Sequence, residues 1–249
     1  MNAPSLSQIK QVAAPYPGLR PFCHEEAEIF FGREPHTDQL LEKLQHAHFI
    51  AVVGPSGCGK SSLVRAGMIA GLETGFLVDA GASWRIVEMR PGDQPIDRLA
   101  DALLAPCALG PERGQGPNEA AILRAMLRRG PLGLVEILRE TPLHPAGNML
   151  LLVDQFEEIF RFREQGNADV AEAFVMLLLA SATQREVPIY VVITMRSDFL
   201  GDCPLFTGLP EAINESQFLT PRLSREQIRA AIVGPARVFG GNVEPALVN

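Results

Sequence analysis

The chain has 249 residues, of which 47% are hydrophobic and 20% are charged, and its formal net charge is −7. This composition excludes an intrinsically disordered chain, and the length allows a sizeable core without disulfides or bound metal. The acidic balance argues against a protein that coats nucleic acid or an anionic membrane surface. The 22 basic residues include only three lysines, Lys10, Lys43 and Lys60.

The four cysteines are widely spaced along the chain and lack the paired Cys/His spacing of a zinc site, which favours a reducing cytoplasm. The N-terminus has no apolar stretch of the kind found in signal peptides. The longest apolar run, residues 173–182, is about half as long as a bilayer-spanning helix. We therefore expect a soluble, cytoplasmic protein without membrane contact.

Residues 1–22 are rich in proline and predict an extended lead-in rather than a helix. After this lead-in, short apolar runs alternate with stretches whose apolar residues recur at helical spacing. The apolar runs predict strands over 48–53, 84–90, 149–153 and 189–195, with a short fifth strand over 216–220. The helical spacing predicts helices around 40–44, over 61–72, after Pro95, and over 118–129, 132–140, 156–162, 168–183 and 225–233.

The strongest motif is the run Gly54-Pro55-Ser56-Gly57-Cys58-Gly59-Lys60-Ser61, which satisfies G-x-x-x-x-G-K-[ST] between a predicted strand and a predicted helix. Glycines let backbone N–H groups curl around a phosphate, and the helix N-terminus adds a partial positive charge. We expect Lys60 to reach the β- and γ-phosphates, Ser61 to bind Mg²⁺ and Ser62 to belong to the same nucleotide site. A glycine-rich turn without a ligand is the alternative, which the flanking strand and helix disfavour.

The run Asp154-Gln155-Phe156-Glu157-Glu158 directly follows the predicted strand 149–153. Asp154 therefore stands at the carboxyl edge of the sheet, where ligands bind in open α/β folds, and is the expected carboxylate for Mg²⁺. Glu157 and Glu158 come about one turn later, where either could orient the attacking water. Acidic residues are also common in a first helical turn, and this explanation competes more strongly for Glu158 than for Glu157.

Arg196 directly follows the predicted strand 189–195 and is expected at the same edge of the sheet. Its guanidinium could contact the γ-phosphate, and a salt bridge to Asp198 or Asp154 is the alternative. P-loop proteins with an additional catalytic acid place a further strand between the phosphate-loop strand and the Walker B strand. We predict that 189–195 is this strand, which would bring Arg196 between Lys60 and Asp154.

Strands separated by helices imply βαβ units and a parallel sheet. We therefore predict an α/β fold: a P-loop NTPase three-layer αβα sandwich with a mainly parallel five-stranded sheet. Residues 1–22 would form the lead-in, 23–220 the NTPase core and 221–249 a C-terminal segment that begins with the helix predicted over 225–233. Residues 105–117, rich in proline and glycine, predict a long loop within the core.

Taken together, the motifs resemble the STAND class of signalling ATPases, specifically the bacterial novel STAND NTPase 1 group. The resemblance covers the chain from residue 15 nearly to its end, and only the phosphate loop would be convincing alone. The matching segments are PYPGLRPF (15–22), FFGRE (30–34), VVGPSGCGKSSLVRAG (52–67), WRIVEMRPGDQP (84–95), LLLVDQFEEIF (150–160), ITMRSDFLGDC (193–203) and LTPRLSREQIRAAIVGPA (219–236).

The resemblance implies residue roles that spacing does not give. Gly32 and Arg33 would lie beside the base and phosphates, Pro235 would pack near adenine at the start of the lid, and Arg196 would be the family's sensor arginine. The cofactors would be ATP or ADP with Mg²⁺. The resemblance also implies a nucleotide-controlled switch that self-associates or joins a larger signalling assembly. The resemblance also makes residues 221–249 the beginning of the family's helical lid. Because that lid continues further in the family, the chain is expected to be a fragment or a stripped-down form of a larger switch.

Three functions fit these residues. The first is a slowly hydrolysing ATPase switch in signalling or defence. The second is an AAA+ or origin-recognition-like ATPase acting on DNA, against which the negative charge and the lack of a basic tract count, so nucleic acid is not an expected partner. The third is a non-hydrolysing module in which bound nucleotide is structural. The sequence has no LSGGQ-like signature, which argues against an ABC transporter ATPase. It also has no NKxD-like guanine reader, which favours ATP or dATP over GTP.

Overall fold

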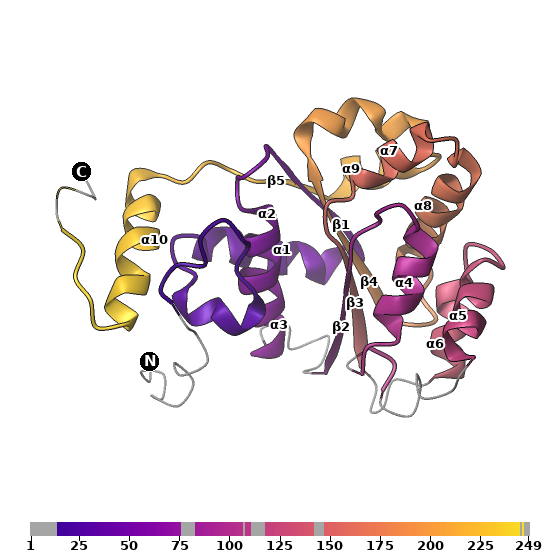
Figure 1. The fold of residues 1–249 in the computed structure, drawn as a ribbon, viewed down its shortest axis with the longest axis horizontal. Helices are drawn as coiled ribbons and strands as arrows, with labels where there is room; N and C mark the ends of the chain where they lie inside the picture. Colours follow the sequence, from indigo (N-terminus) through magenta and orange to yellow (C-terminus); the bar gives the residue numbers. More distant parts are fainter. Residues whose placement is uncertain are drawn as a thin grey trace.

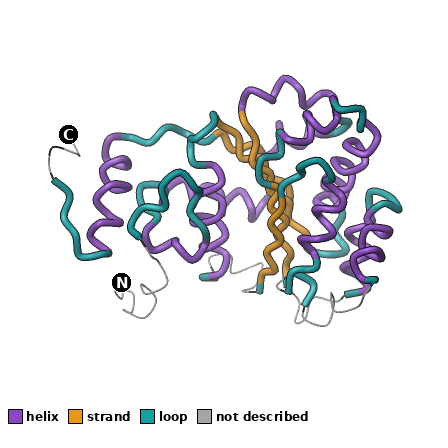
Figure 2. The backbone as a smooth tube through the Cα atoms, viewed as in Figure 1, coloured by secondary structure: helices purple, strands orange, loops and turns teal. Residues whose placement is uncertain are grey.

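The computed structural model describes residues 14–75, 83–106, 108–110, 118–141, 147–244 and 246. Most of the lead-in, most of the loop predicted over 105–117 and the end of the predicted lid lie outside these described residues. A five-stranded, wholly parallel sheet carries helices on both faces (Figures 1 and 2). The predicted α/β, three-layer class is therefore confirmed.

All five predicted strands are present, each within one residue of its predicted bounds. They are β1 (Phe49–Gly54), β2 (Trp84–Met89), β3 (Asn148–Val153), β4 (Ile189–Arg196) and β5 (Gln217–Leu219). Their order across the sheet is β2-β3-β4-β1-β5. As the topology argument predicts, β4 lies between β1, which leads into the phosphate loop, and β3, which leads to Asp154.

Helices form a layer on each side of the sheet. One layer holds α1 (Glu34–His46) and a continuous helix behind the phosphate loop, made of α2 (Lys60–Ser62), the π-helical segment η3 (Leu63–Ile69) and α3 (Ala70–Glu73). The opposite side holds α4 (Pro95–Leu103), α5 (Glu119–Leu127), α6 (Gly133–Glu140), α7 (Glu158–Glu164), α8 (Ala168–Thr183) and α9 (Leu209–Ser216). The 3₁₀ helices η2 (His24–Ile29) and η4 (Ser197–Leu205) precede α1 and follow β4, and the last helix is α10 (Arg225–Val238).

Alternate residues of each central strand enter two separate hydrophobic cores. In β1, Ala51 and Val53 join the core beneath α4 to α9, whereas Ile50 and Val52 join the core beneath α1 and the phosphate-loop helix. Strands β1 and β3 are buried along their whole length. This explains why they appear in the sequence as continuous apolar runs rather than as alternating patterns, as expected for a parallel sheet covered on both faces.

Several predicted helices have different bounds in the structure, among them those predicted over 156–162 and 225–233. The helix predicted over 156–162 begins only at Glu158, because the preceding residues form a turn in which Gln155 adopts a left-handed conformation with φ 57°. The helix predicted over 225–233 continues to Val238 with Pro235 inside it. Helical periodicity predicts neither η4 nor α9, whose prolines and bounding glycine obscure the spacing.

The last helix, α10, stands apart from the sheet and packs beside the N-terminal segment (Figure 1). A capping box starts this helix: the Ser224 hydroxyl accepts from the Gln227 amide at 3.2 Å, and the Gln227 side chain accepts from the Ser224 amide at 2.8 Å. None of the helices in the described part of the chain has the length and apolarity needed to cross a bilayer.

Candidate phosphate-binding site

The loop between β1 and α2 has the conformation that the glycine-rich motif predicts. Gly57 and Gly59 have φ angles of 75° and 91°, in the left-handed region that other residues rarely adopt. A Cβ at either position would meet no atom within 4 Å, so glycine is required there by backbone conformation rather than by crowding. The loop then delivers Lys60 and Ser61 to the first turn of the following helix.

Lys60 lies at the centre of this loop and is only 9% exposed. Its Nζ donates hydrogen bonds to the carbonyl oxygens of Gly54 and Pro55, both at 2.9 Å. These acceptors carry only partial charge, whereas a phosphate would offer the ammonium a full negative charge and a stronger hydrogen bond. The loop therefore holds a buried cation that is ready to exchange carbonyl oxygens for phosphate oxygens.

Asp154 is fully buried just beyond the end of β3 and is surrounded by polar groups. Its Oδ1 accepts hydrogen bonds from the hydroxyls of Ser61 and Thr194, both at 2.6 Å. Its Oδ2 faces two guanidinium groups, Nη2 of Arg65 at 3.3 Å and Nη2 of Arg90 at 3.5 Å, without a hydrogen bond. A buried carboxylate is tolerated only with such compensation.

Ser61 and Asp154 fit the chemistry of Mg²⁺. The ion prefers oxygen ligands and is usually held by one or two side chains together with phosphates and water. A hydroxyl and a carboxylate oxygen 2.6 Å apart supply such a pair. The second carboxylate oxygen carries no hydrogen bond and can accept one from a coordinated water. The described residues contain no group of three or more His, Cys, Asp or Glu side chains that could hold a metal ion.

The two candidate glutamates lie in different places. Glu157 is 8% exposed, lines the same cleft as Lys60, and its Oε2 lies 3.4 Å from the backbone nitrogen of Arg196, which donates to it. Glu158 turns away, because its Oε2 accepts a 2.8 Å hydrogen bond from the Gly92 amide and its side chain lines a separate hollow. The structure thus brings Glu157 to the phosphate loop and leaves Glu158 outside the cleft.

Arg196 ends β4 directly beside the start of the phosphate loop, paired in register with Gly54. Its Nη2 lies 2.5 Å from Oδ2 of Asp198, and its guanidinium sits 5.9 Å from the centre of the Phe199 ring. The salt bridge to Asp198 that the sequence offers as an alternative is therefore present. The side chain also lines the cleft, so a phosphate there would compete with Asp198 for the same guanidinium.

Lys60, Ser61, Glu157 and Arg196 line one cleft of about 450 Å³, whereas the fully buried Asp154 does not reach its surface. Its walls come from three parts of the chain that are far apart in the sequence. The phosphate loop contributes Ser56, Gly57, Gly59, Lys60, Ser61 and Ser62; the strand ends contribute Arg90, Gln155, Glu157, Thr194 and Arg196; and the lead-in contributes Gly18, Leu19, Arg20, Pro21 and Phe22. The third wall is not predicted by any motif.

The lead-in is fixed to the cleft at several points. The Phe22 amide donates to the Ser62 hydroxyl at 3.1 Å, next to the phosphate loop. Arg20 forms a two-pronged pair with Glu26 at 2.7 and 2.5 Å, and this hydrogen-bonded guanidinium lowers the pKa of Glu26 to about 2. The Tyr16 hydroxyl donates to the Ile232 carbonyl of α10 at 2.5 Å. Residues 16–22 therefore connect the phosphate loop to the last helix.

Several residues that were predicted to bind the nucleotide do not line the cleft: Gly32, Arg33, Gly54, Pro55, Cys58 and Pro235. Arg33 is buried, which lowers its pKa, and it donates to the carbonyls of Cys58 and Pro221, both at 2.8 Å. Gly32 packs against α10, and Pro235 is buried within that helix. These residues join the back of the phosphate loop to the segment that leads into α10.

The sequence analysis assigns no role to four residues that take part in the site: Arg65, Arg90, Gln155 and Thr194. Two of them carry a recognisable signal. Arg90 directly follows a strand, the same position that singles out Asp154 and Arg196. Arg65 lies four residues after Ser61, one helical turn along the same face. The left-handed Gln155 has no such signal; its backbone amide donates to the Thr194 hydroxyl at 3.0 Å.

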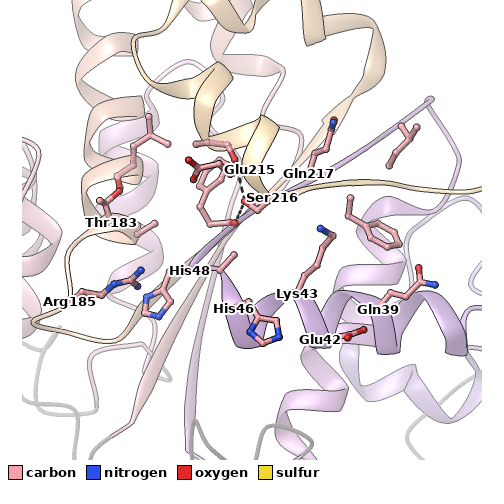
Figure 3. A pocket seen from close by; sticks show the side chains of 17 residues that line it. Gln39, Glu42, Lys43, His46, His48, Thr183, Arg185, Glu215, Ser216 and Gln217 are labelled. Atoms are coloured by element: carbon pink, nitrogen blue, oxygen red, sulfur yellow. Dashed lines mark hydrogen bonds between the residues drawn. The ribbon is translucent and has the colours of Figure 1, made fainter.

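A larger cavity of about 820 Å³ opens near the opposite edge of the sheet, around the start of β1 (Figure 3). Its charged residues are of both signs: Lys43 and Arg185 are basic, and Glu42 and Glu215 are acidic. Burial lowers the pKa of His48, and the Ser216 hydroxyl is already engaged by the Phe49 carbonyl. None of the residues predicted to bind nucleotide lies in it, so the smaller cleft is the candidate site.

Comparison with known proteins agrees with this geometry. The sequence model of the family described as Novel STAND NTPase 1 matches residues 15–249. The sn-glycerol-3-phosphate import ATP-binding protein UgpC of Salmonella typhi is 52% identical over 69 residues, 26% of this chain and 18% of that protein. The aliphatic sulfonates import ATP-binding protein SsuB of Bacillus cereus is 42% identical over 55 residues, 20% of this chain and 21% of that protein. The matched part spans about a fifth of these curated relatives.

Among solved structures, the Walker-type ATPase Paby2304 of Pyrococcus abyssi is similar with a TM-score of 0.51 and 17% identity, covering 92% of this chain and 64% of that one. The ORC1 protein of Aeropyrum pernix, solved in complex with DNA, has a TM-score of 0.50 and 17% identity, covering 85% of this chain and 50% of that one. Identities this low establish a shared fold and nothing further.

Proposed function

The chain belongs to the Novel STAND NTPase 1 family, and from this premise we propose that it is an Mg²⁺-dependent, slowly hydrolysing ATPase switch. The observation that carries the proposal is the 2.6 Å contact between Ser61, which lines the cleft together with the buried Lys60, and the fully buried Asp154. A phosphate-binding loop, a hydroxyl–carboxylate pair for Mg²⁺ and a nearby glutamate are the parts that phosphoryl transfer to water requires.

Each side chain has a role in this proposal. Lys60 exchanges its two carbonyl acceptors for β- and γ-phosphate oxygens, and Ser61 with Asp154 holds Mg²⁺. When bound, the ion would neutralise negative charge that develops on the phosphate during hydrolysis. Glu157 orients the attacking water and accepts its proton. Arg196 leaves Asp198 for the γ-phosphate, while Glu158 has no part in the chemistry.

The switch in this proposal depends on two connections between the cleft and α10. The lead-in links the Ser62 hydroxyl to the Ile232 carbonyl through Phe22 and Tyr16. Arg33 links the Cys58 carbonyl to Pro221, in the segment before α10. A nucleotide that repositions the phosphate loop or the lead-in would act on α10 through both. We place this cytoplasmic switch in signalling or defence, with self-association or a larger assembly as its output.

A phosphate-release assay at high protein concentration tests the enzyme. Lys60→Ala should abolish release, and Lys43→Ala, which alters a lysine at the distant cavity, should not change it. Equal rates for the wild-type chain and Lys60→Ala would refute hydrolysis at this site. If both release no phosphate but the wild-type chain still binds nucleotide, the non-hydrolysing module is the better description.

A DNA-associated ATPase is the second candidate, because the ORC1 protein of Aeropyrum pernix shares the fold and was solved with DNA. The net charge of −7 still argues against it. Adding double-stranded DNA to the phosphate-release assay separates the two candidates. Stimulated release would favour the DNA-associated ATPase, and an unchanged rate would favour the switch.

A further inference from the structure

We propose that Arg90 is released by magnesium: its guanidinium neutralises Asp154 until Mg²⁺ binds there, and then contacts the terminal phosphate of ATP. Arg90 would thereby help the site to distinguish ATP from ADP. The inference rests on the proposed function, because it requires an Mg²⁺–nucleotide complex in the cleft.

The two arginines that face Asp154 are held very differently. Arg65 is 19% exposed and has a second anchor, a 2.9 Å ion pair between its Nε and Oε2 of Glu88. Arg90 is 48% exposed, and its contact with Asp154 is a 3.5 Å ion pair. Within the described part of the chain, this is the one ion pair that Arg90 makes. Arg65 is therefore a fixed partner of the carboxylate, whereas Arg90 is a loosely held one.

The position of Arg90 gives it a second partner when a nucleotide is present. Arg90 and Asp154 directly follow β2 and β3, and Arg196 is the last residue of the neighbouring β4. The carboxylate therefore lies between two arginines at the carboxyl edge of the sheet. Arg90 lines the cleft together with Lys60 and Arg196, and Arg65 does not. A phosphate group in the cleft would thus meet the Arg90 side chain directly.

Electrostatics and anchoring decide which of the two arginine–Asp154 ion pairs breaks when Mg²⁺ binds. Before metal binds, the single negative charge of Asp154 is shared by Ser61, Thr194 and two guanidinium groups. Mg²⁺ at the Ser61–Asp154 pair adds two positive charges beside these guanidiniums, and like charges repel most strongly where desolvated. The longer and more exposed contact, that of Arg90, breaks first. ATP offers the freed guanidinium a γ-phosphate, and ADP does not.

Equilibrium binding measures this without depending on turnover. We would compare the dissociation constants of a non-hydrolysable ATP analogue and of ADP, each with Mg²⁺ and with a chelator, for the wild-type chain, Arg90→Gln and Arg90→Lys. Arg98→Gln, an exposed arginine on α4 outside the cleft, is the matched control. With Mg²⁺, Arg90→Gln should lower the preference for the ATP analogue over ADP about tenfold, and Arg90→Lys should restore part of it.

The chelator arm distinguishes this role from a structural one. Without Mg²⁺, Arg90 stays on Asp154, so Arg90→Gln should leave the ratio of the two affinities unchanged. A ratio that is unchanged with Mg²⁺, or that changes equally with and without Mg²⁺, would overturn the inference while leaving the proposed function standing. If the wild-type chain binds neither nucleotide, the proposed function fails and this inference with it. Melting temperatures confirm that each variant is folded.

Discussion

The hydroxyl of Ser61 donates a 2.6 Å hydrogen bond to the carboxylate of Asp154, across 93 residues of chain. The contact joins the helix after the phosphate loop to the end of β3, although β4 separates β3 from β1 in the sheet. Two side chains that would share one ion are thus already adjacent before the ion binds. Such preorganisation means that little rearrangement accompanies catalysis.

Asp154→Asn keeps the shape of this pair and removes its charge. We expect Mg²⁺-dependent phosphate release to fall on the order of 100-fold, because the metal loses its carboxylate. Nucleotide affinity in the presence of a chelator should change by less than about threefold, since the phosphate loop is intact. Asp154→Ala should lose hydrolysis at least as fully, with a further loss of stability because the buried hydroxyls of Ser61 and Thr194 also lose their acceptor. Unimpaired hydrolysis in either variant would refute the assignment of Asp154 as a ligand of Mg²⁺.

Glu157 and Glu158 are adjacent in sequence, but only the first lines the cleft, so each serves as the control for the other. Glu157→Gln should reduce phosphate release on the order of 100-fold or more while nucleotide still binds, because the group that orients the water is lost. Glu158→Gln should stay within about threefold of wild type, because that carboxylate binds the Gly92 amide outside the cleft. Single-turnover measurements on both variants decide the assignment. The reverse order of effects would show that the two side chains exchange places when nucleotide binds.

Arg196→Ala tests the proposed phosphate sensor. Because its guanidinium can turn from Asp198 to a γ-phosphate, its loss should weaken the ATP complex about tenfold and the ADP complex little. Titration calorimetry with ADP and a non-hydrolysable ATP analogue measures both affinities. Unlike the effect of Arg90, this one should persist without Mg²⁺, because Arg196 does not depend on the metal for its release. An unchanged ratio of the affinities for the ATP analogue and for ADP would mean that Arg196 only forms its salt bridge with Asp198 and does not sense the γ-phosphate.

The sequence predicts the sheet and the site's main residues for a simple physical reason. Buried parallel strands are continuous apolar runs, and the residue that follows each run must stand at the ligand-binding edge. Asp154 and Arg196 are found in this way, and the same rule would have found Arg90 after β2. The position of β4 between β1 and β3 also follows from counting strands between the motifs.

The features that escape prediction depend on contacts between distant segments. The proline-rich lead-in predicts an extended chain, but nothing local to it indicates that Phe22 would bond Ser62 or that Tyr16 would reach Ile232. The sequence pattern also cannot tell which of the adjacent glutamates, Glu157 or Glu158, faces the cleft. Only the left-handed turn at Gln155 decides that Glu157 enters the cleft and Glu158 leaves it.

The Arg20–Glu26 pair should make stability depend on pH in the acid range. The pKa of Glu26 is lowered in the folded state from its ordinary 4.5 to about 2, chiefly by the hydrogen-bonded Arg20 guanidinium. Its contribution is therefore fully present above pH 4.5 and is lost as the pH falls toward 2. Urea unfolding of the wild-type chain and Glu26→Gln at several pH values measures it. The difference between the two should be largest above pH 5 and shrink steadily below pH 4.5. A difference that does not vary with pH would mean that the pair contributes through packing alone.

Gly32→Ala should detach α10 or destabilise the fold, because a Cβ at this position would lie 2.3 Å from the Gln227 carbonyl oxygen. The backbone there has φ +83°, which is unfavourable for alanine, so the substitution adds conformational strain to the steric clash. We expect a loss of roughly 2–4 kcal/mol in unfolding free energy, or faster proteolysis within α10 if that helix moves away instead. Gly166→Ala is the matched control, since its φ is +92° and a Cβ there meets nothing within 4 Å. This control isolates the conformational part and should lose only about 1–2 kcal/mol. Equal losses for the two variants, with α10 equally protected, would contradict the close packing of Gly32 against α10.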